Sequence, residues 1–280
     1  MNINFLMEET EKKRYSVRNY LEREVEPDTK EKIESYIASL ENPFGKKVNF
    51  HFLNSNEMEG EEKLGTYGVI KGAKQYMGTT IKLEPMALEA LGYELEAVIL
   101  YLADLGLGTC WLGGTFNRKG FASAMNIGED ELFPIITPYG YPAEKMHIKE
   151  KAMRRMIKAD HRKEWQELFY NNDFSTPLGE ETVGDLRFPL EMVRLGPSAS
   201  NKQPWRVLLK DNACHFYEYK EPGYSKYFSY DIQRVDMGIA AAHFDFSVKE
   251  KGINGDFDTE CEPEVELPEH MEYRFSWIRK

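Results

Sequence analysis

The sequence carries the same order of predicted elements twice: a helix, two strands, a second helix and a further strand. In the first half, helical spacing and strand-like alternation predict these elements over residues 28–40, 48–53, 75–81, 86–105 and 133–139. In the second half, they are predicted over residues 189–195, 205–209, 214–219, 232–246 and 273–278. The repeat concerns the order of elements rather than residue identity. It predicts two similar halves that each combine helices with a sheet.

The connection between the halves is expected at residues 171–185, which are rich in Asn, Asp, Gly, Thr and Pro and have the composition of a linker. Residues 1–170 are then the first half, and residues 186–280 are the second. The clearest single element is the helix over residues 86–105. Its apolar residues predict one buried stripe and are Leu88, Leu91, Leu95, Val98, Leu102 and Leu105.

Composition excludes several classes of protein. The chain has 280 residues and a formal net charge of −11, so it has no general attraction to nucleic acid. Its three cysteines form no C-x-x-C pair and its six histidines are scattered, which argues against a metal site and suits a reducing compartment. No apolar stretch is long enough to cross a membrane, and no export signal is recognisable. We expect a soluble cytoplasmic protein that binds neither membrane nor nucleic acid.

The first motif that could carry chemistry is Arg14-Tyr-Ser-Val-Arg18. Two guanidinium groups and a hydroxyl within five residues can converge on a phosphate or another delocalised anion. The alternative is a charged turn in solvent, which is the commoner fate of such runs.

The second motif is Gly196-Pro-Ser-Ala-Ser-Asn-Lys-Gln-Pro-Trp205, a rigid loop that leads directly into a strand. Its hydroxyl and amide groups point in fixed directions and could recognise a ligand. The alternative is an ordinary turn whose side chains bond to their own backbone.

The third motif, Gly106-Leu-Gly-Thr-Cys-Trp-Leu-Gly-Gly114, superficially resembles a dinucleotide-binding loop. That loop follows a strand and opens a helix, whereas this motif closes a helix, so a Rossmann fold is rejected. Its glycines could let the backbone approach a flat ligand closely. The alternative is a helix end with a buried Trp111, and Cys110 is expected to serve packing only.

Together, the three motifs resemble the signature segments of the FMN-dependent nitroreductase family. One subunit of an ordinary member carries all three segments, and two subunits build the FMN sites across their interface. Here the first half has the first and third segments, while residues 41–50 replace the second. The second half has the second segment, while residues 251–257 replace the third. The chain therefore looks like the "putative TM nitroreductase" branch, in which two halves are fused as an internal pseudo-dimer.

The resemblance implies an α+β, nitroreductase-like fold whose halves each have an antiparallel or mixed sheet flanked by helices. It implies one complete FMN site per chain, and a monomer is allowed because the dimer interface is internal. The site residues that it implies in the three segments are Arg14, Tyr15, Ser16, Arg18, Trp111, Leu112, Gly113, Gly114, Pro197, Ser198, Ala199, Ser200, Asn201 and Gln203.

The resemblance also assigns roles to some of these residues. Arg14 and Ser16 are expected at the phosphate and ribityl end of FMN, and Arg18 at the pyrimidine edge of the flavin. Residues 112–114 are expected to direct backbone amides at flavin N5. From the other half, the side chains expected at the ribityl chain and ring edge are those of Ser198, Ser200 and Asn201. Gln203 is expected to be structural.

A K-x-R element that follows the strand end in the family is expected to complete the phosphate site. Here Lys149-Glu-Lys151 stands at about the matching distance after Gly140-Tyr-Pro142, with Lys in place of Arg at the second basic position. Arg154 and Arg155 lie nearby. Which of these four basic residues reaches the phosphate stays open.

The implied activity is ping-pong electron transfer from NADH or NADPH, through flavin N5, to nitroaromatics, quinones or similar small acceptors. The flavin performs the chemistry, so no side chain is expected to be catalytic. One alternative is an FMN-binding module that a partner protein reduces or that acts as a sensor. Another is reductive dehalogenation or flavin modification on the same fold.

Overall fold

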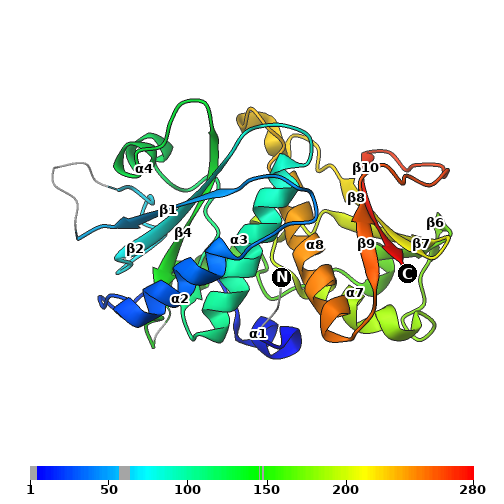
Figure 1. Cartoon of the computed structure of the whole chain (residues 1–280), viewed down its shortest axis with the longest axis horizontal. Helices are drawn as coiled ribbons and strands as arrows, with labels where there is room; N and C mark the ends of the chain where they lie inside the picture. The colour runs from blue at the N-terminus through cyan, green and yellow to red at the C-terminus, as the bar shows by residue number, and fades with distance from the viewer. Residues whose placement is uncertain (1–4, 57–63, 145, 147) are drawn as a thin grey trace.

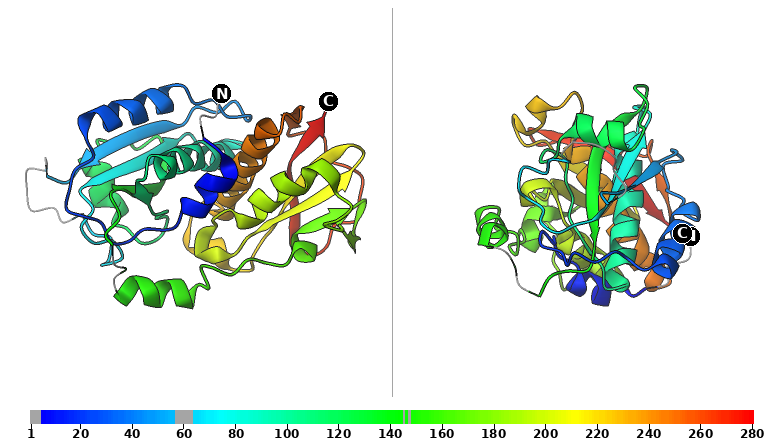
Figure 2. Two further views of the ribbon diagram at one scale, coloured as in Figure 1. Left: turned by 90° about the horizontal axis from the view of Figure 1, so that it is seen from below. Right: turned by 90° about the vertical axis from the view of Figure 1, so that its left-hand side faces the viewer.

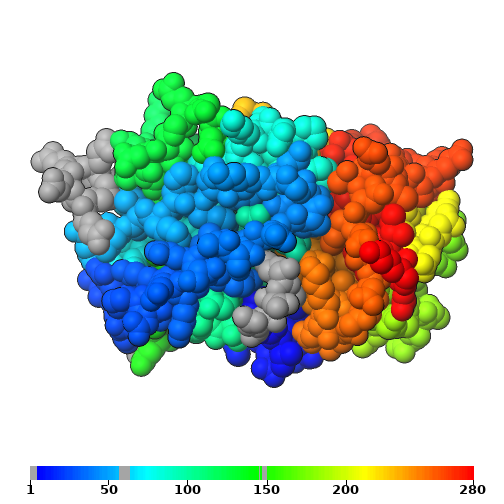
Figure 3. All heavy atoms as spheres, in the orientation of Figure 1, coloured from blue at the N-terminus to red at the C-terminus, as the bar shows by residue number. Residues whose placement is uncertain are grey.

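The computed structural model describes residues 5–56, 64–144, 146 and 148–280, except for the side chains of residues 148 and 149. Two helices, α3 (Ala87–Asp104) and α8 (Gln233–Glu250), pack side by side at the centre of the molecule, with one sheet on each side of the pair (Figure 1). Figure 3 shows the same division on the surface, with the blue-to-green first half beside the orange and red second half.

The two sheets share one strand order, which confirms the duplicated order of elements. The first sheet runs β1-β2-β4-β3, formed by β1 (Asn49–Asn54), β2 (Gln75–Ile81), β4 (Leu132–Gly140) and β3 (Gly108–Thr109). The second contains β7-β8-β10-β9, formed by β7 (Trp205–Lys210), β8 (Ala213–Tyr219), β10 (Met271–Arg279) and β9 (Gly255–Asp258). Neighbouring strands in both sets are antiparallel.

The expected linker is partly built into the second sheet. β5 (Phe169–Asn171) pairs in parallel with β7, and β6 (Asp173–Pro177) pairs with β5 at the sheet edge. Before them, α6 (Trp165–Leu168) buries Trp165 in the shared core. The composition of this stretch thus did not show that it joins a sheet, because strand pairing at an edge tolerates polar residues.

The remaining helices lie around this framework. Those of the first half are α1 (Met7–Lys13), α2 (Pro27–Ala38), α4 (Arg118–Ala124) and α5 (Ile148–Met156). Those that follow are α7 (Arg187–Leu195) and three short 3₁₀ turns, Gly184–Leu186, Ala199–Asn201 and Tyr224–Tyr227. Figure 2 shows α5 (green) at the periphery of the first half. This position matters because α5 supplies one rim of the cavity described below.

The central helices approach each other at two glycines. A Cβ atom on Gly92 would lie 2.1 Å from the carbonyl oxygen of Val235, and one on Gly238 would lie 2.0 Å from that of Glu89. Only glycine allows backbones this close. As a result α3 is buried on nearly all of its faces, not on the one stripe predicted, because the first sheet covers one side and α8 the other.

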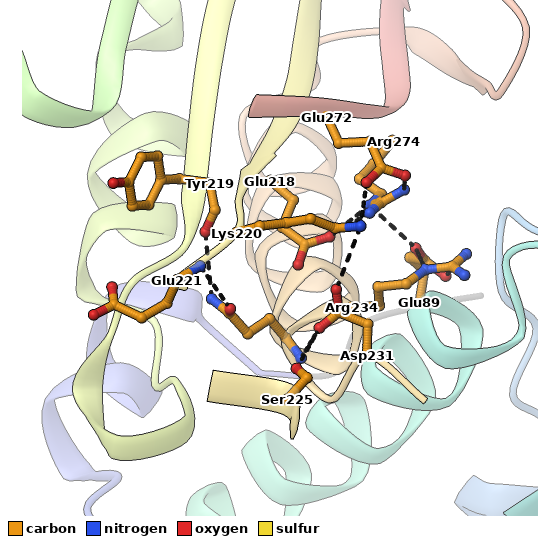
Figure 4. Close-up of polar contacts among 11 residues, drawn as sticks. Glu89, Glu218, Tyr219, Lys220, Glu221, Ser225, Asp231, Arg234, Glu272 and Arg274 are labelled. Atoms are coloured by element: carbon orange, nitrogen blue, oxygen red, sulfur yellow. Dashed lines mark hydrogen bonds and ion pairs between the residues drawn. The ribbon is translucent and has the colours of Figure 1, made fainter. Parts of the chain in front are cut away.

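Buried polar side chains of α3 find their partners in the second half. Glu89 receives two bonds from Arg234, of 2.7 and 2.9 Å, and Glu96 lies 2.9 Å from Nε2 of His243. In Figure 4 the Glu89 pair continues to Arg274, which also binds the buried carboxylate of Glu218. An unpaired buried charge is costly, so each half depends on the other to satisfy its interior.

Candidate functional site

A cavity of about 340 Å³ lies between the two halves, and it brings together residues from all three sequence motifs. From the first half it is lined by Ser16, Arg18 and residues 111–114, together with Met153 on α5 and Ile157 directly after it. From the second half it is lined by residues 197–200, by Tyr224 and Phe228, and by the start of α8. The volume falls in the range of small-molecule sites.

Ser16 and Arg18 reach the cavity because their segment runs beside β3. The Val17 amide donates to the Thr109 carbonyl at 2.8 Å, and Ser16 forms a bridge with the same residue. Arg18 is only 8% exposed. One of its terminal nitrogens donates to the Ser16 carbonyl at 3.2 Å, while its buried Nε–H has no protein partner. A buried cation with a free donor on a cavity wall suits an oxygen-rich, anionic ligand.

Arg14 and Tyr15 do not reach this cavity, contrary to expectation; they border a separate pocket of about 140 Å³. Glu11 binds the Arg14 guanidinium through two bonds, of 2.8 and 2.9 Å. Arg14 Nε also lies 3.9 Å from Glu96 Oε1. The guanidinium is turned toward these carboxylates because they are buried and need a counter-charge. The motif pattern could not show which of its two arginines would be used in this way.

Leu112, Gly113 and Gly114 line the cavity as expected, and their backbone is held from behind. Leu112 pairs with Ile136 of β4, and the Gly113 carbonyl accepts a 2.8 Å bond from Arg118. A Cβ atom on Gly113 would lie 3.1 Å from the Ile135 side chain. The absence of side chains therefore leaves backbone exposed to whatever the cavity holds.

Trp111 also lines the cavity, and its indole is fixed by a buried polar group. Its Nε1 donates to Oε2 of Glu96 at 3.0 Å. The other oxygen of Glu96 contacts His243, so the ring orientation is tied to the contact between α3 and α8. The alternative interpretation, a Trp buried only for packing, does not account for its place on the cavity wall.

Pro197, Ser198, Ala199 and Ser200 line the cavity from the second half. Ser200, Asn201 and Gln203 have positive φ angles of 51°, 57° and 49°, which is strained for Ser and Gln. The loop is held in this shape by bonds at several points. The Ser198 hydroxyl accepts from the Gln203 amide at 2.8 Å, and the Gln203 side chain accepts from the Lys163 amide at 2.8 Å.

Asn201 and Gln203 do not line the cavity. The Asn201 side-chain amide donates to the carbonyls of Lys158 and His161, at 2.7 and 2.9 Å, so it secures the chain after α5. The contact of Asn201 with FMN stays a prediction. The structural position of Gln203 agrees with its expected role.

Of the four basic candidates around α5, the three whose side chains the structure describes do not line the cavity. Lys151 and Arg155 are exposed, and Arg154 pairs with Asp160 and lies over the Tyr15 ring, 5.9 Å from its centroid. The side chain of Lys149 lies outside the described residues. The residues of this helix that line the cavity are instead Met153 and Met156.

Two other features of the motifs have structural explanations. Cys110 is 2% exposed, and burial raises the pKa of its thiol, which agrees with a packing role. Ligand atoms of Glu11, Glu96 and His243 lie within 4.8 Å of one another, a spacing that could hold a metal ion. However, Arg14 Nε lies 2.8 Å from Glu11 and 3.9 Å from Glu96, so a guanidinium already supplies positive charge there.

The two segments that replace the missing motifs also meet each other. Phe44, from residues 41–50, is 8% exposed. Its ring centroid lies 6.1 Å from that of Phe257, at the end of residues 251–257, 5.3 Å from that of Phe275 and 6.5 Å from that of Tyr93. Aromatic side chains thus fill the junction of the two degenerate segments.

Sequence reasoning missed residues that line the cavity or support its wall. Arg118 donates to the carbonyls of Phe133 and Pro134 as well as Gly113, and to the Tyr230 hydroxyl of the other half, so it shapes the wall. Asp236 lies on the cavity at the start of α8. The sequence held one signal for Asp236, namely an acidic residue directly after an apolar position of a helix predicted to be buried. It held no signal for Arg118.

The chain is similar to several solved structures. A putative nitroreductase from Thermotoga maritima MSB8 is 20% identical, with a TM-score of 0.62 over 99% of this chain and 95% of its own. An FMN-dependent nitroreductase from Clostridium difficile R20291 is 18% identical, with a TM-score of 0.42 over 49% and 88%. A nitroreductase with bound FMN from Bacteroides fragilis NCTC 9343 is also 18% identical, with a TM-score of 0.42 over 52% and 94%. The curated proteins contain no match.

The first of these structures shows that the fold is nitroreductase-like. Among the residues that the structure describes, no helix is both long and apolar enough to span a bilayer. The family model described as "Putative TM nitroreductase" matches residues 6–248, which include all three motifs and extend from the first half into the second. The chain therefore belongs to this TM nitroreductase family.

Proposed function

We propose that the cavity binds FMN and that the chain is an NAD(P)H-dependent oxidoreductase for nitroaromatics, quinones or related electron-poor acceptors. One observation carries the proposal: Ser16, Arg18 and residues 112–114 of the first half share one cavity wall with residues 197–200 of the second. Bound FMN supplies hydride acceptance from a nicotinamide and electron transfer to the acceptor. Family membership supports the same reaction class.

The residues present fit a flavin. Ile135, Ile232 and Val235 offer apolar side chains to a flat ring, and Gly113 and Gly114 leave backbone accessible beside them. Arg18 is the one Lys or Arg side chain among the described residues that line the cavity, and its free Nε–H can donate to a ligand oxygen. Its charge also favours a ligand that gains negative charge on reduction.

We further propose one FMN per chain. Residues from all three motifs line one cavity, while Phe44, Phe257 and Phe275 fill the junction of the degenerate segments. Because both halves contribute to one cavity within one chain, a second copy is not required to complete it.

The experiment is anaerobic reduction of the purified protein, followed by a panel of acceptors. We expect a yellow protein that retains about one FMN per chain and whose flavin band is bleached by NADH or NADPH. A colourless protein that ignores added FMN would contradict the proposal. Tight FMN retention without bleaching by either nicotinamide, but with reduction by a flavoprotein or ferredoxin, would favour the binding-module alternative.

A further inference from the structure

Asp236 is a buried acid on the cavity wall that none of the motifs includes. It lies in the first turn of α8, is 3% exposed, and lines the cavity beside Val235 and Ile239. Its position is set by the close approach of α8 to α3 at Gly238, two residues later. The side chain is therefore held in one place by the packing of the central helices.

The two carboxyl oxygens of Asp236 have different surroundings. Oδ1 accepts a 3.0 Å bond from the backbone amide of Ala199, in the strained loop that forms part of the same wall. Oδ2 is buried and has no hydrogen-bond partner in the protein. Buried carboxyl oxygens are normally satisfied, so an orphaned oxygen on a cavity wall indicates a partner that the cavity will supply.

The charges around Asp236 favour its neutral form. Burial raises the pKa of Asp236 well above 3.8, and the Ala199 amide offsets only part of this effect. The carboxyl groups of Glu218 on β8, Asp231 before α8 and Glu96 on α3 raise it further. Tyr224, on the adjoining 3₁₀ turn, also lines the cavity, as does the cation Arg18. No Lys or Arg within the described residues pairs with Asp236 at salt-bridge distance.

We propose that Asp236 contacts the cofactor and donates a hydrogen bond from Oδ2 to an acceptor atom of FMN, so that flavin binding is linked to a proton on this side chain. A neutral carboxyl has one O–H, and Oδ1 is already an acceptor for Ala199, which places the proton on Oδ2. An ionised Asp236 would face an anionic ligand without a donor and would repel it. This inference rests on the proposed FMN site.

The test compares wild type with Asp236→Asn, whose side chain keeps an acceptor for Ala199 and a permanent donor toward the cavity. The matched control is Asp245→Asn on the same helix, because Asp245 is 6% exposed but lies away from the cavity and bonds to Tyr93 and Lys249. The dissociation constant of FMN is measured by flavin fluorescence from pH 5.5 to 9. Riboflavin, which lacks the phosphate, is titrated in parallel, and thermal unfolding checks that each variant is folded.

Above the pKa of Asp236, we expect wild type and Asp245→Asn to lose affinity by up to about tenfold per pH unit, relative to Asp236→Asn. Calorimetry in buffers of different ionisation enthalpy should show proton uptake in the first two proteins that Asp236→Asn lacks. The same difference should appear with riboflavin, because it does not depend on the phosphate.

If wild type and a folded Asp236→Asn both bind FMN with superimposable pH profiles, the role of Asp236 is overturned and the proposed FMN site is not. Failure of wild type to bind FMN or riboflavin at any pH would overturn both this inference and the proposed FMN site.

Discussion

Removal of each arginine of the first motif should affect a different property. Loss of Arg18 should weaken FMN binding, and loss of Arg14 should lower the free energy of unfolding. Arg18 is buried on the cavity wall with a free Nε–H and one bond to a backbone carbonyl inside the protein. Arg14 is away from the cavity and neutralises Glu11 and Glu96. Arg18 is therefore available to a ligand, whereas Arg14 is bound to carboxylates in the protein interior.

The magnitudes follow from these partners. Arg18→Ala removes a charge-assisted bond to FMN of about 1.5–3 kcal/mol, which weakens FMN binding by about 10- to 150-fold. Its cost to the free energy of unfolding should be about 1 kcal/mol, from the single internal bond. Arg14→Ala leaves buried carboxylates without a counter-charge, so it should lower the free energy of unfolding by about 3–5 kcal/mol. Its folded fraction should bind FMN nearly as wild type does.

The assay pairs urea denaturation with FMN titration of each variant below its unfolding transition. Arg14→Lys, which restores the charge but not the two-bond geometry, should recover part of the stability. Arg23→Ala is the control, because Arg23 is exposed in a surface pair with Glu26 and should change neither quantity appreciably. An Arg14→Ala protein of wild-type stability that has lost FMN, together with an Arg18→Ala protein that binds normally, would refute the reasoning.

Three further predictions concern the framework of the site. Gly238→Ala should lower the free energy of unfolding by about 1–3 kcal/mol, since the clash with the Glu89 carbonyl exceeds the helix-propensity gain of about 1 kcal/mol; urea denaturation measures it. Phe44→Ala should cost about 3–5 kcal/mol in the same assay because it empties an aromatic junction, while FMN affinity is kept. Burial raises the pKa of Glu94 to about 7, and the hydrogen bond from Asn42 offsets this only in part. The contribution of Glu94 to the free energy of unfolding is therefore full below pH 4.5 and is lost as the pH rises through 7. Glu94→Gln, which keeps the carbonyl for Asn42, should remove about 3 kcal/mol of that loss between pH 5 and 8.

Each of these has a contradicting result. A Gly238→Ala protein as stable as wild type would mean that the central helices can separate freely. Loss of FMN on Phe44→Ala would place the aromatic junction in the ligand site. An unchanged slope of stability against pH in Glu94→Gln would show that this carboxyl is ionised in the folded protein throughout the range.

Local sequence was enough to place many elements. The predicted strand over residues 75–81 matches β2, and the predicted strands over residues 205–209 and 214–219 pair through a turn that has Asp211 and Asn212 in left-handed conformations. Both depend on neighbours in sequence, namely alternation and turn residues. The short strands β5, β6 and β9 were missed, because pairing with a neighbouring strand rather than their own pattern makes them strands.

The motifs by themselves predicted which segments would come together, and residues from all three line one cavity. Only the tertiary structure decided which side chains within each segment face it. Arg14 turns to Glu11 and Asn201 to the chain after α5, because buried partners there need a counter-charge or a hydrogen bond. Asp236 reaches the wall because two glycines let the central helices meet, a contact between residues 146 positions apart that no local pattern reports.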